Sequence, residues 1–440
     1  MLVVLCRGIS LVVLGGVLWS AMLWAQTRVY IDINKVGGYL LPLALPQFLH
    51  EDASVPLPQD IRTVIRQDLE VTGLFRIVDP ATYIDPMPSA LDTLVYDNWA
   101  LIGATGVVTG RLDREPGSPD ILLQLVLHDV AQRQPVELRE FRGAATRYRE
   151  MAHRFSNHIF RAFTGEEGPF DTQVVCETPR QSAAAGKDIT IMDYDGYDVQ
   201  RIVTDGALNL APILSPDGHY LAYTSYRAGS PDLYLRDMRT TREERLTTGP
   251  GLAVAGSWSP DGRYLALNHT VQGNSDIYLY DTQSKRLTRL TQDWGIDVSP
   301  NFAPDGRRLV FTSDRGGSPQ LYLTDTQGGT PVRLTYDGRY NTAPAWSPRH
   351  DTIAYVGRSD SGSFALYTIG ANGQGRQQVT QGGGEVDAPS WDPNGRFIMY
   401  VNRRGGTWQR QIVREDGQGK PLSTAGPLCL APQWVARMMP

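Results

Sequence analysis

The sequence predicts an exported protein of two domains, a small α/β domain followed by an all-β, six-bladed β-propeller. The chain has 440 residues, which is more than one hydrophobic core usually organises. A phrase of about 44 residues recurs through its second half, which is typical of a propeller. The first 25 residues have the parts of a secretory signal peptide.

The repeated phrase is the main evidence for the propeller. Pro216-Asp-Gly, Pro260-Asp-Gly and Pro304-Asp-Gly lie 44 positions apart, and Pro348 and Pro393 continue the series after 44 and 45 positions. Pro presets φ and Gly accepts positive φ, so Pro-Asp-Gly predicts a tight turn between two strands. An alternating strand, Leu-Tyr-Leu or Ile-Tyr-Leu, and an Arg-Leu-Thr strand follow in the first three units. Four short strands cannot bury both faces of their sheet alone, and radial stacking of such sheets gives a propeller.

The sixth unit is divided between the two ends of the repeat region. Five complete units cover about residues 208–427, and residues 430–434 repeat the opening strand before the chain stops. The missing strands are expected upstream, at residues 172–177, 188–193 and 199–203. We therefore expect a split blade formed by residues near 172–204 and the C-terminus, which closes the ring and removes exposed sheet edges.

Two cysteines, Cys176 and Cys429, fall in this split blade. An oxidising compartment would permit a disulfide bond, which would stabilise the ring by about 2 to 4 kcal/mol in the loop-entropy model. Counted along a regular hairpin, however, the two residues are offset rather than opposite. Two unpaired thiols are therefore the favoured interpretation, and a disulfide is the alternative.

The region before the propeller has no repeat and predicts a sheet with helices packed on it. Residues 60–73 place Ile61, Val64, Ile65 and Leu69 at helical spacing, and a second helix is expected over residues 148–163. Strands are expected at residues 29–33, 75–78, 106–112, 121–127 and 136–141. Residues 164–169 are the expected hinge into the propeller, so the predicted domains are 26–165 and 166–440.

The N-terminus predicts export. Arg7 precedes an apolar run over residues 9–19, and Ala25 precedes a polar sequence that begins at Gln26. Cleavage after Ala25 is expected, because the run is shorter than the roughly 20 residues of a membrane-spanning helix. An uncleaved membrane anchor is the alternative. Residue 26 is not Cys, so no lipid anchor is expected there.

Composition and motifs argue against several functional classes. A formal net charge of −5 does not provide the excess of positive charge that is typical of nucleic-acid-binding proteins. The sequence has no Gly-x-Ser-x-Gly, His-Glu-x-x-His or P-loop, so we expect no enzymatic activity and no cofactor. His153 and His158 are five residues apart and should point to different helix faces, which disfavours zinc. Asp193-Tyr-Asp-Gly196 is interpreted as a turn rather than a calcium loop, although an ion such as calcium in the propeller tunnel is left open.

Two segments are similar to a known family. The junction over residues 152–172, from Ala152-His-Arg-Phe-Ser-Asn-His to Gly-Pro-Phe-Asp-Thr, and the stretch Met192-Asp-Tyr-Asp-Gly-Tyr resemble the TolB family, the periplasmic propellers of the Tol–Pal system. The resemblance covers essentially the whole mature chain. The propeller repeat by itself is shared by many proteins, whereas the junction together with the split blade is specific.

The resemblance implies a monomeric periplasmic adaptor, peripheral to the membrane through its partners, that ties envelope layers together and supports outer-membrane constriction during cell division. Pal, a lipoprotein, is the expected partner at one mouth of the tunnel. In the family, part of that contact lies just before the first strand of each blade. The matching positions here are Leu252, Ala255, Val298, Ser299, Asn341, Thr342 and Asp387. Several are apolar where the family often has His, Thr or acidic residues, so blade packing is the competing interpretation.

The mature N-terminal segment resembles the mobile segment by which the family engages TolA. It contains Thr27, Arg28, Val29, Tyr30, Ile31 and Asp32, and it could pair with a partner by strand addition. A fixed edge strand is the alternative. Two other functions are retained at this point: a periplasmic propeller that binds a small ligand, carbohydrate or metal, and a propeller hydrolase or peptidase accessory.

Overall fold

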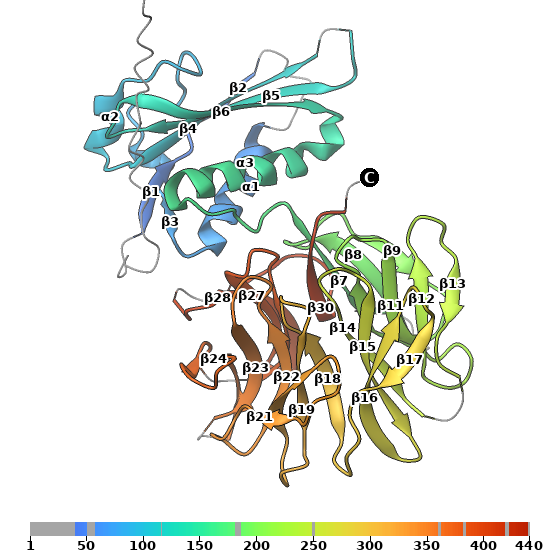
Figure 1. Ribbon diagram of the computed structural model, residues 1–440. Coiled ribbons are helices and arrows are strands. Elements are labelled where there is room, and N and C mark those ends of the chain that lie inside the picture. Colours follow the sequence, from blue (N-terminus) through green and yellow to red (C-terminus); the bar gives the residue numbers. More distant parts are fainter. Residues whose placement is uncertain are drawn as a thin grey trace, which may run out of the picture.

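The computed structural model describes residues 40–50, 58–115, 117–180, 186–248, 251–359, 362–381, 384–418 and 422–438. Within these ranges the chain forms an α/β domain followed by a six-bladed propeller, which confirms the predicted fold class (Figure 1). The predicted signal peptide and the segment from Thr27 to Asp32 lie outside the described residues. No helix in the described ranges is long and apolar enough to cross a bilayer.

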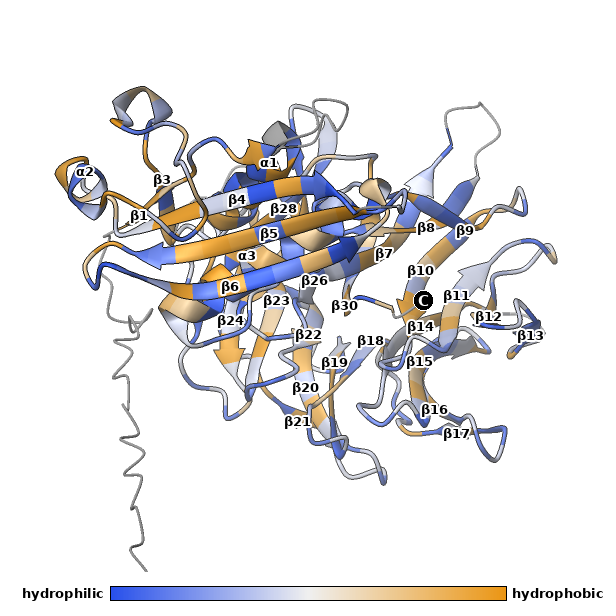
Figure 2. Cartoon of the chain, turned by 90° about the horizontal axis from the view of Figure 1, so that it is seen from above, coloured by the Kyte–Doolittle hydropathy of each residue, from blue (hydrophilic) through white to orange (hydrophobic). Residues whose placement is uncertain are grey.

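The N-terminal domain is built on one mixed sheet with strand order β3-β1-β4-β5-β6, and β2 pairs with β4. In its parallel part β1 lies between β3 and β4, and β2 also runs parallel to β4, whereas β4, β5 and β6 form an antiparallel meander. Apolar and polar bands alternate along this meander in Figure 2. The strands are β1 (Leu41–Ala44), β2 (Leu49–His50), β3 (Phe75–Ile77), β4 (Gly106–Arg114), β5 (Ile121–Asp129) and β6 (Gln134–Gly143).

Two long helices lie between this sheet and the propeller (Figure 1). The predicted face of α1 (Pro58–Val71) is buried at Ile61, Val64, Ile65 and Leu69, and each such side chain contributes about 1.5–3 kcal/mol to the core. The second long helix, α3 (Tyr148–Thr164), ends at Gly165, whose φ of 77° satisfies the left-handed C-cap. Shorter helical turns, which the periodicity did not predict, are η1 (Pro80–Thr82), α2 (Tyr96–Leu101) and η2 (Ala145–Arg147).

Each propeller blade is a four-stranded antiparallel sheet. Among the described residues, blades 1 to 3 are β10 (Asn209–Leu214), β11 (Tyr220–Ser225), β12 (Asp232–Asp237) and β13 (Glu243–Arg245); β14 (Ala253–Trp258), β15 (Tyr264–Val271), β16 (Asn274–Asp281) and β17 (Arg286–Arg289); and β18 (Asp297–Phe302), β19 (Arg308–Ser313), β20 (Gln320–Asp325) and β21 (Val332–Arg333). Blades 4 and 5 are β22 (Asn341–Trp346), β23 (Thr352–Arg358), β24 (Phe364–Gly370) and β25 (Gln377–Gln378); and β26 (Glu385–Trp391), β27 (Phe397–Arg404), β28 (Thr407–Arg414) and β29 (Leu422–Ser423).

The Pro-Asp-Gly repeats form the turns between the first two strands of blades 1 to 3. Their aspartates, Asp217, Asp261 and Asp305, each accept a hydrogen bond from the backbone N–H two residues later, at 3.0, 3.0 and 2.8 Å. The glycines that follow have φ near 70°, a conformation that a side chain at Cβ would disfavour. The repeated Asp-Gly pair therefore stabilises the turns.

The sixth blade is split as predicted. Its strand order is β30-β7-β8-β9, so β30 (Leu430–Ala436) pairs with β7 (Thr172–Pro179), followed by β8 (Lys187–Asp193) and β9 (Gln200–Val203). Trp434 on β30 donates from Nε1 to Thr172 Oγ1 at 2.7 Å. The last strand of the chain is thus held by the first strand of the propeller, which closes the ring.

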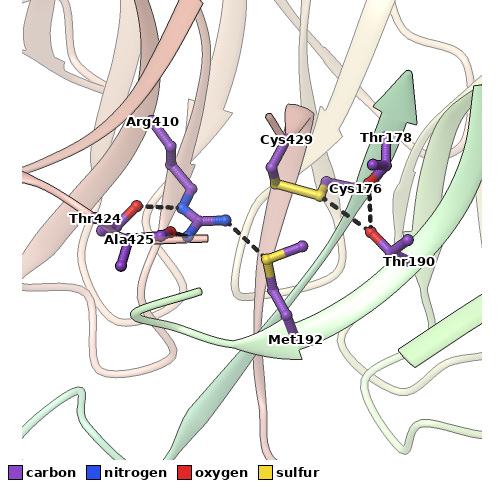
Figure 3. The surroundings of a disulfide bond; sticks show 8 residues. All are labelled: Cys176, Thr178, Thr190, Met192, Arg410, Thr424, Ala425 and Cys429. Atoms are coloured by element: carbon purple, nitrogen blue, oxygen red, sulfur yellow. Dashed lines mark hydrogen bonds between the residues drawn. A yellow bond between two sulfur atoms is a disulfide. The ribbon is translucent and has the colours of Figure 1, made fainter. Parts of the chain in front are cut away.

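Cys176 and Cys429 form a disulfide bond across this closure (Figure 3). The expectation of two unpaired thiols is therefore wrong. It assumed a regular ladder, whereas the pairing of β30 with β7 shifts register between Leu430 and Gln433, where Ala431 has a φ of 44°. With this irregularity the two Cα atoms lie 5.5 Å apart, within the usual range for a disulfide.

The connection between the domains, expected to be a hinge, is tied to blade 5. Glu166 pairs with Arg396, and Asn394 Nδ2 donates to the carbonyl oxygen of Gly168 at 3.1 Å. Phe160 of α3 also packs edge-on against Phe397 of β27, with ring centroids 6.2 Å apart. One buried apolar cluster includes residues of both domains. The predicted boundary at residue 165 thus falls in a segment with contacts to both domains.

Candidate functional site

Six inner strands form a ring around the propeller axis: β10, β14, β18, β22, β26 and β30. Adjacent inner strands are in contact all the way around this ring. Side chains of one blade hold the next: Ser257 Oγ, Asn301 Oδ1 and Ser390 Oγ each accept the backbone N–H of a residue in the following inner strand, at 2.8 Å. These contacts make the ring a rigid support for a ligand or a partner protein that binds at either end.

Every inner strand has a register irregularity near its middle. In five of the six, a residue with positive φ precedes a proline there, which is uncommon for residues other than Gly and costs about 1–3 kcal/mol each. These residues are Ala211, Ser299, Ala343, Ala388 and Ala431, with φ between 44° and 54°. Blade 2 has Ala255-Gly256 instead, and a Cβ on Gly256 would lie 2.3 Å from the carbonyl oxygen of Pro300.

The two ends of the ring are different. The ends of the inner strands border a cavity of about 2030 Å³ that is also lined by Arg147, Glu150 and Arg154 of the N-terminal domain. We call this end the domain face. Each inner strand is extended, so its beginning lies at the opposite end of the ring, which we call the distal face.

The seven positions predicted to border a tunnel mouth lie in the first halves of the inner strands or just before them. Leu252 precedes β14 and is 37% exposed, and Asp387 on β26 is also exposed. Val298, Ser299 and Thr342 are half-buried. Ala255 and Asn341 are buried, and Asn341 donates from Nδ2 to Gln320 Oε1 at 2.8 Å. The side chains of Ala255 and Asn341 therefore pack inside the propeller and are not presented at the surface.

Two large aromatic side chains on the connections into the inner strands were missed by sequence reasoning. Trp294 precedes β18 and is 74% exposed, and Tyr336 precedes β22 and is 72% exposed. Ile296, at 49% exposure, lies beside the first of them. The signal was available, because both aromatics fall between an Arg-Leu-Thr strand and the next inner strand, outside the repeated phrase. Exposed aromatics of this kind are enriched at protein interfaces.

Asp387 is an ionisable group near the distal end of the ring. Its pKa is raised, mainly because the surrounding protein desolvates the carboxylate and in part because Glu177 repels it. The hydrogen bond from the Ala388 N–H acts in the opposite direction. The side chain still reaches solvent, so a cationic or hydrogen-bonding group of a partner could approach it directly.

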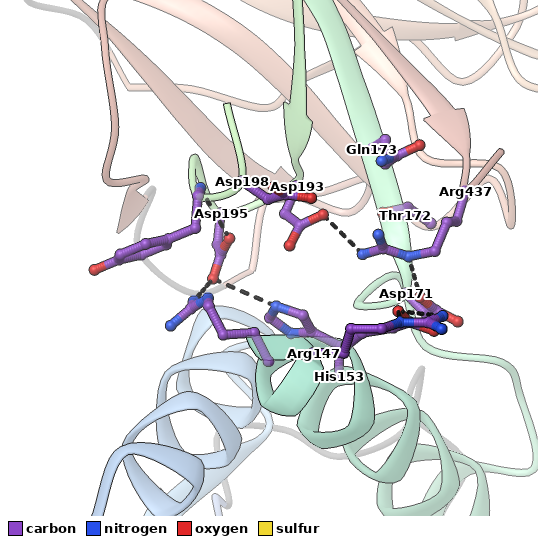
Figure 4. A network of polar contacts seen from close by, with 12 residues as sticks. Arg147, His153, Asp171, Thr172, Gln173, Asp193, Asp195, Asp198 and Arg437 are labelled. Carbon is purple, nitrogen blue, oxygen red and sulfur yellow. Dashed lines mark hydrogen bonds and ion pairs between the residues drawn. The ribbon is translucent and has the colours of Figure 1, made fainter. Parts of the chain in front are cut away.

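A second polar cluster lies at the contact between the domains. His153 on α3 is buried against Asp68 on α1, and Tyr194 and Asp195 come from the turn between β8 and β9. Figure 4 shows His153 beside Asp195. His158 instead faces Glu137 at 3.4 Å, so the two histidines have separate environments, as their spacing predicts. The sequence interpretation of residues 193–196 as a turn did not anticipate these contacts.

Three members of this cluster, Asp68, His153 and Asp195, lie close enough together that their ligand atoms could reach one metal ion. Asp68 already accepts from His153 Nδ1 and the Tyr194 hydroxyl, and Asp195 pairs with Arg149. These contacts leave fewer free ligand atoms than the three or four that zinc takes from protein. The Arg149 guanidinium also opposes a second cation beside Asp195. The arrangement fits a metal ion poorly.

These features define a class of protein: a closed six-bladed propeller with an α/β domain fixed to one face and exposed aromatic side chains on the other. The TolB amino-terminal domain family matches residues 29–136, and the TolB beta propeller domain family matches residues 160–436. The chain belongs to the TolB family.

Individual relatives agree with this assignment. The chain is 37% identical over 202 residues to the Tol-Pal system protein TolB of Cereibacter sphaeroides, a match covering 45% of each chain. It is 37% identical over 216 residues to the protein of the same name from Dinoroseobacter shibae, covering 48% of each. These matches therefore span about half the length of the curated relatives. The crystal structure of TolB from Acinetobacter baumannii is similar over 90% of this chain and 97% of its own, with a TM-score of 0.80 and 27% identity.

Proposed function

We propose that the protein is a non-catalytic periplasmic adaptor of the Tol–Pal system that binds Pal on the distal face and TolA through the segment from Thr27 to Asp32. In this proposal residues 1–25 are a cleaved signal peptide and the domains comprise residues 26–165 and 166–440. Membership of the TolB family and the names of the curated relatives support the system. The choice of Pal and TolA as the individual partners follows from the family resemblance, and the experiments below test each of them.

The observation that carries the proposal is the exposure of Trp294 and Tyr336 beside the beginnings of β18 and β22. Ile296, two residues after Trp294, and Leu252, which precedes β14 in the adjacent blade, are also exposed and apolar. Aromatic side chains of this size dominate binding energy when a partner buries them. Asp387 adds one negative charge in a partly desolvated position. A partner that covers this side of the distal face would bury apolar area and orient itself on the carboxylate.

The domain face is less suited to a large protein partner. The N-terminal domain stands over it, and Arg437, which follows β30, pairs there with Asp171 and Asp193. The cavity it contains favours instead a second candidate function, the binding of a small ligand. Binding of a carbohydrate or metal ion that Gln433→Ala weakens would support that function, because Gln433 lines the cavity.

Calorimetry of the mature chain with the soluble domain of Pal from the same organism tests the proposal. Trp294→Ala is expected to weaken binding by about fivefold or more, since truncating an aromatic side chain at the centre of an interface costs about 1 to 4 kcal/mol. Leu101→Ala is the matched control, because Leu101 is 78% exposed but lies in the N-terminal domain. Equal affinities for the two variants and the wild type would reject this site. No measurable heat for the wild type would reject Pal as the partner.

The TolA part of the proposal has its own test. Deleting residues 26–32 from the mature chain should abolish binding to TolA and leave Pal binding measurable. Retention of TolA binding by the deleted chain would contradict the role assigned to this segment.

A further inference from the structure

A buried histidine at the contact between the domains has a geometry that partner binding does not explain. His153 is fully buried on α3. Its Nδ1 lies 3.0 Å from both carboxylate oxygens of Asp68 on α1. Its Nε2 faces Oδ2 of Asp195, 3.6 Å away, in the propeller turn after β8 (Figure 4). The imidazole therefore lies between one carboxylate of the N-terminal domain and one of the propeller.

This placement depends on the protonation state of the ring. A neutral imidazole carries one N–H and can donate to only one of the two carboxylates. With the proton on Nδ1, a buried lone pair on Nε2 would face the negative charge of Asp195. Nε2 has no hydrogen-bond partner among the residues that the structure describes. Only the imidazolium presents positive charge to both Asp68 and Asp195.

Other charged groups around the ring come from three elements. Tyr194, in the same turn as Asp195, donates its hydroxyl to Asp68 Oδ1 at 2.6 Å and packs edge-on against the imidazole. Asp193, at the end of β8, adds negative charge and is paired with Arg437 after β30, at 2.8 Å. Arg149, one turn before His153 on α3, pairs with Asp195.

These surroundings shift the pKa of His153 upward. Burial is the largest single influence and lowers the pKa, but Asp68, Asp195 and Asp193 together outweigh it. The direction agrees with the geometry, which has a carboxylate on each side of the ring.

We propose that His153 is a proton-dependent latch that fixes the N-terminal domain to the propeller through Asp68 and Asp195. When the ring loses a proton, the contact with Asp195 loses its attraction. The turn over residues 194–198 is then held to the N-terminal domain only by its other contacts, such as the ion pair of Asp195 with Arg149 and the hydrogen bond from Tyr194 to Asp68, and its attachment to α3 is weakened. The remaining contacts between the domains, such as Glu166 with Arg396, do not involve this ring.

The direction of the pH dependence follows from linkage. A histidine whose pKa is raised on folding stabilises the folded state fully at pH values below its unfolded pKa, about 6.5. That contribution is lost as the pH rises through the folded-state pKa. The latch is therefore closed in mildly acidic conditions and opens on the alkaline side.

Nitrogen-15 NMR of the imidazole groups in the whole mature chain tests the proposal without any substitution. His153 is expected to be doubly protonated at pH 6.5 and to titrate above that value. His158 on the same helix should titrate below it, because burial and Arg139 lower its pKa. A neutral His153 ring at pH 6.5 would overturn the proposal. So would a change in its signals on addition of equimolar Zn²⁺ or of EDTA, which would assign the ring to a metal.

Amide hydrogen exchange gives a second, local readout. After correction for the intrinsic effect of pH, exchange over residues 194–198 should accelerate severalfold as His153 deprotonates. The variant His153→Gln should show fast exchange at every pH, whereas His158→Gln should behave as the wild type does. Exchange that is independent of pH in the wild type would contradict the latch even if His153→Gln failed to fold.

Discussion

The two faces of the propeller use the same residue types in opposite ways. At the domain face, four tryptophans lie at or near the ends of inner strands and are only 4–6% exposed: Trp258, Trp346, Trp391 and Trp434. Trp391 and Trp434 also donate their indole N–H groups to neighbouring strands. At the distal face, Trp294 and Tyr336 stand 74% and 72% exposed. Position within the repeat, rather than residue type, thus separates side chains that hold blades together from those available to a partner.

Replacing one tryptophan at each face should give the largest contrast. Trp434→Ala is expected to lower the free energy of unfolding by about 3–5 kcal/mol, because it leaves a cavity in the split blade and removes the hydrogen bond from the indole to Thr172. Trp294→Ala should change it by less than about 0.5 kcal/mol, since the side chain is exposed. Urea denaturation followed by circular dichroism measures both. Similar losses for the two variants would remove the distinction between the faces.

The disulfide should give the next largest effect, and only in the split blade. The double variant Cys176→Ala, Cys429→Ala opens a covalent link between residues 253 positions apart. We expect a loss of about 2–5 kcal/mol in the free energy of unfolding. Thermal unfolding with and without reductant provides the check, because the reductant should not affect the variant. A variant as stable as the oxidised wild type would show that the hydrogen bonds of β30 suffice to close the ring.

Much of the fold could be predicted because its determinants repeat. The Pro-Asp-Gly turns, the Leu-Tyr-Leu strands and the displaced strand at residues 430–434 fix strand order by local chemistry, and each is visible in several copies. The disulfide was misjudged because a register irregularity at Ala431 cannot be counted from a regular ladder. A signal for it existed, since alanine or serine precedes proline at the same place in five inner strands.

The candidate site was less predictable because it depends on exposure and on contacts between domains. The family positions lie at the beginnings of the inner strands, yet Ala255 and Asn341 are buried there. Nothing in the spacing shows that Trp294 is exposed while Trp258 is not. Asp195 and His153 are separated by 42 positions and meet only because α3 lies against the split blade.

The irregularity within the inner strands allows a finer comparison between the two halves of one strand. Ala343 in β22 has a φ of 49°, so Ala343→Gly should be neutral or stabilise the protein by up to about 1 kcal/mol. Two residues later, Ala345 is buried without positive φ, and Ala345→Gly should destabilise by about 1 kcal/mol. The same denaturation assay compares them. A larger loss for Ala343→Gly would show that its Cβ contributes contacts that outweigh the strain.

The smallest expected effect is electrostatic and confined to the distal face. The raised pKa of Asp387 means that the folded state disfavours its charged form. Stability of the wild type relative to Asp387→Asn should therefore fall as the pH rises from the unfolded pKa of about 3.9 through the folded-state pKa. Denaturation at pH 3 and pH 7 measures the difference. A difference that is the same at both values would mean that the carboxylate is not desolvated.

Amide hydrogen exchange of the mature chain with and without the soluble domain of Pal tests most directly whether the distal face is the binding face. The account predicts slowed exchange over residues 292–299 and 336–342, with no change over residues 215–219 and 433–437 at the domain face. Protection at the domain face without protection at the distal face would contradict it.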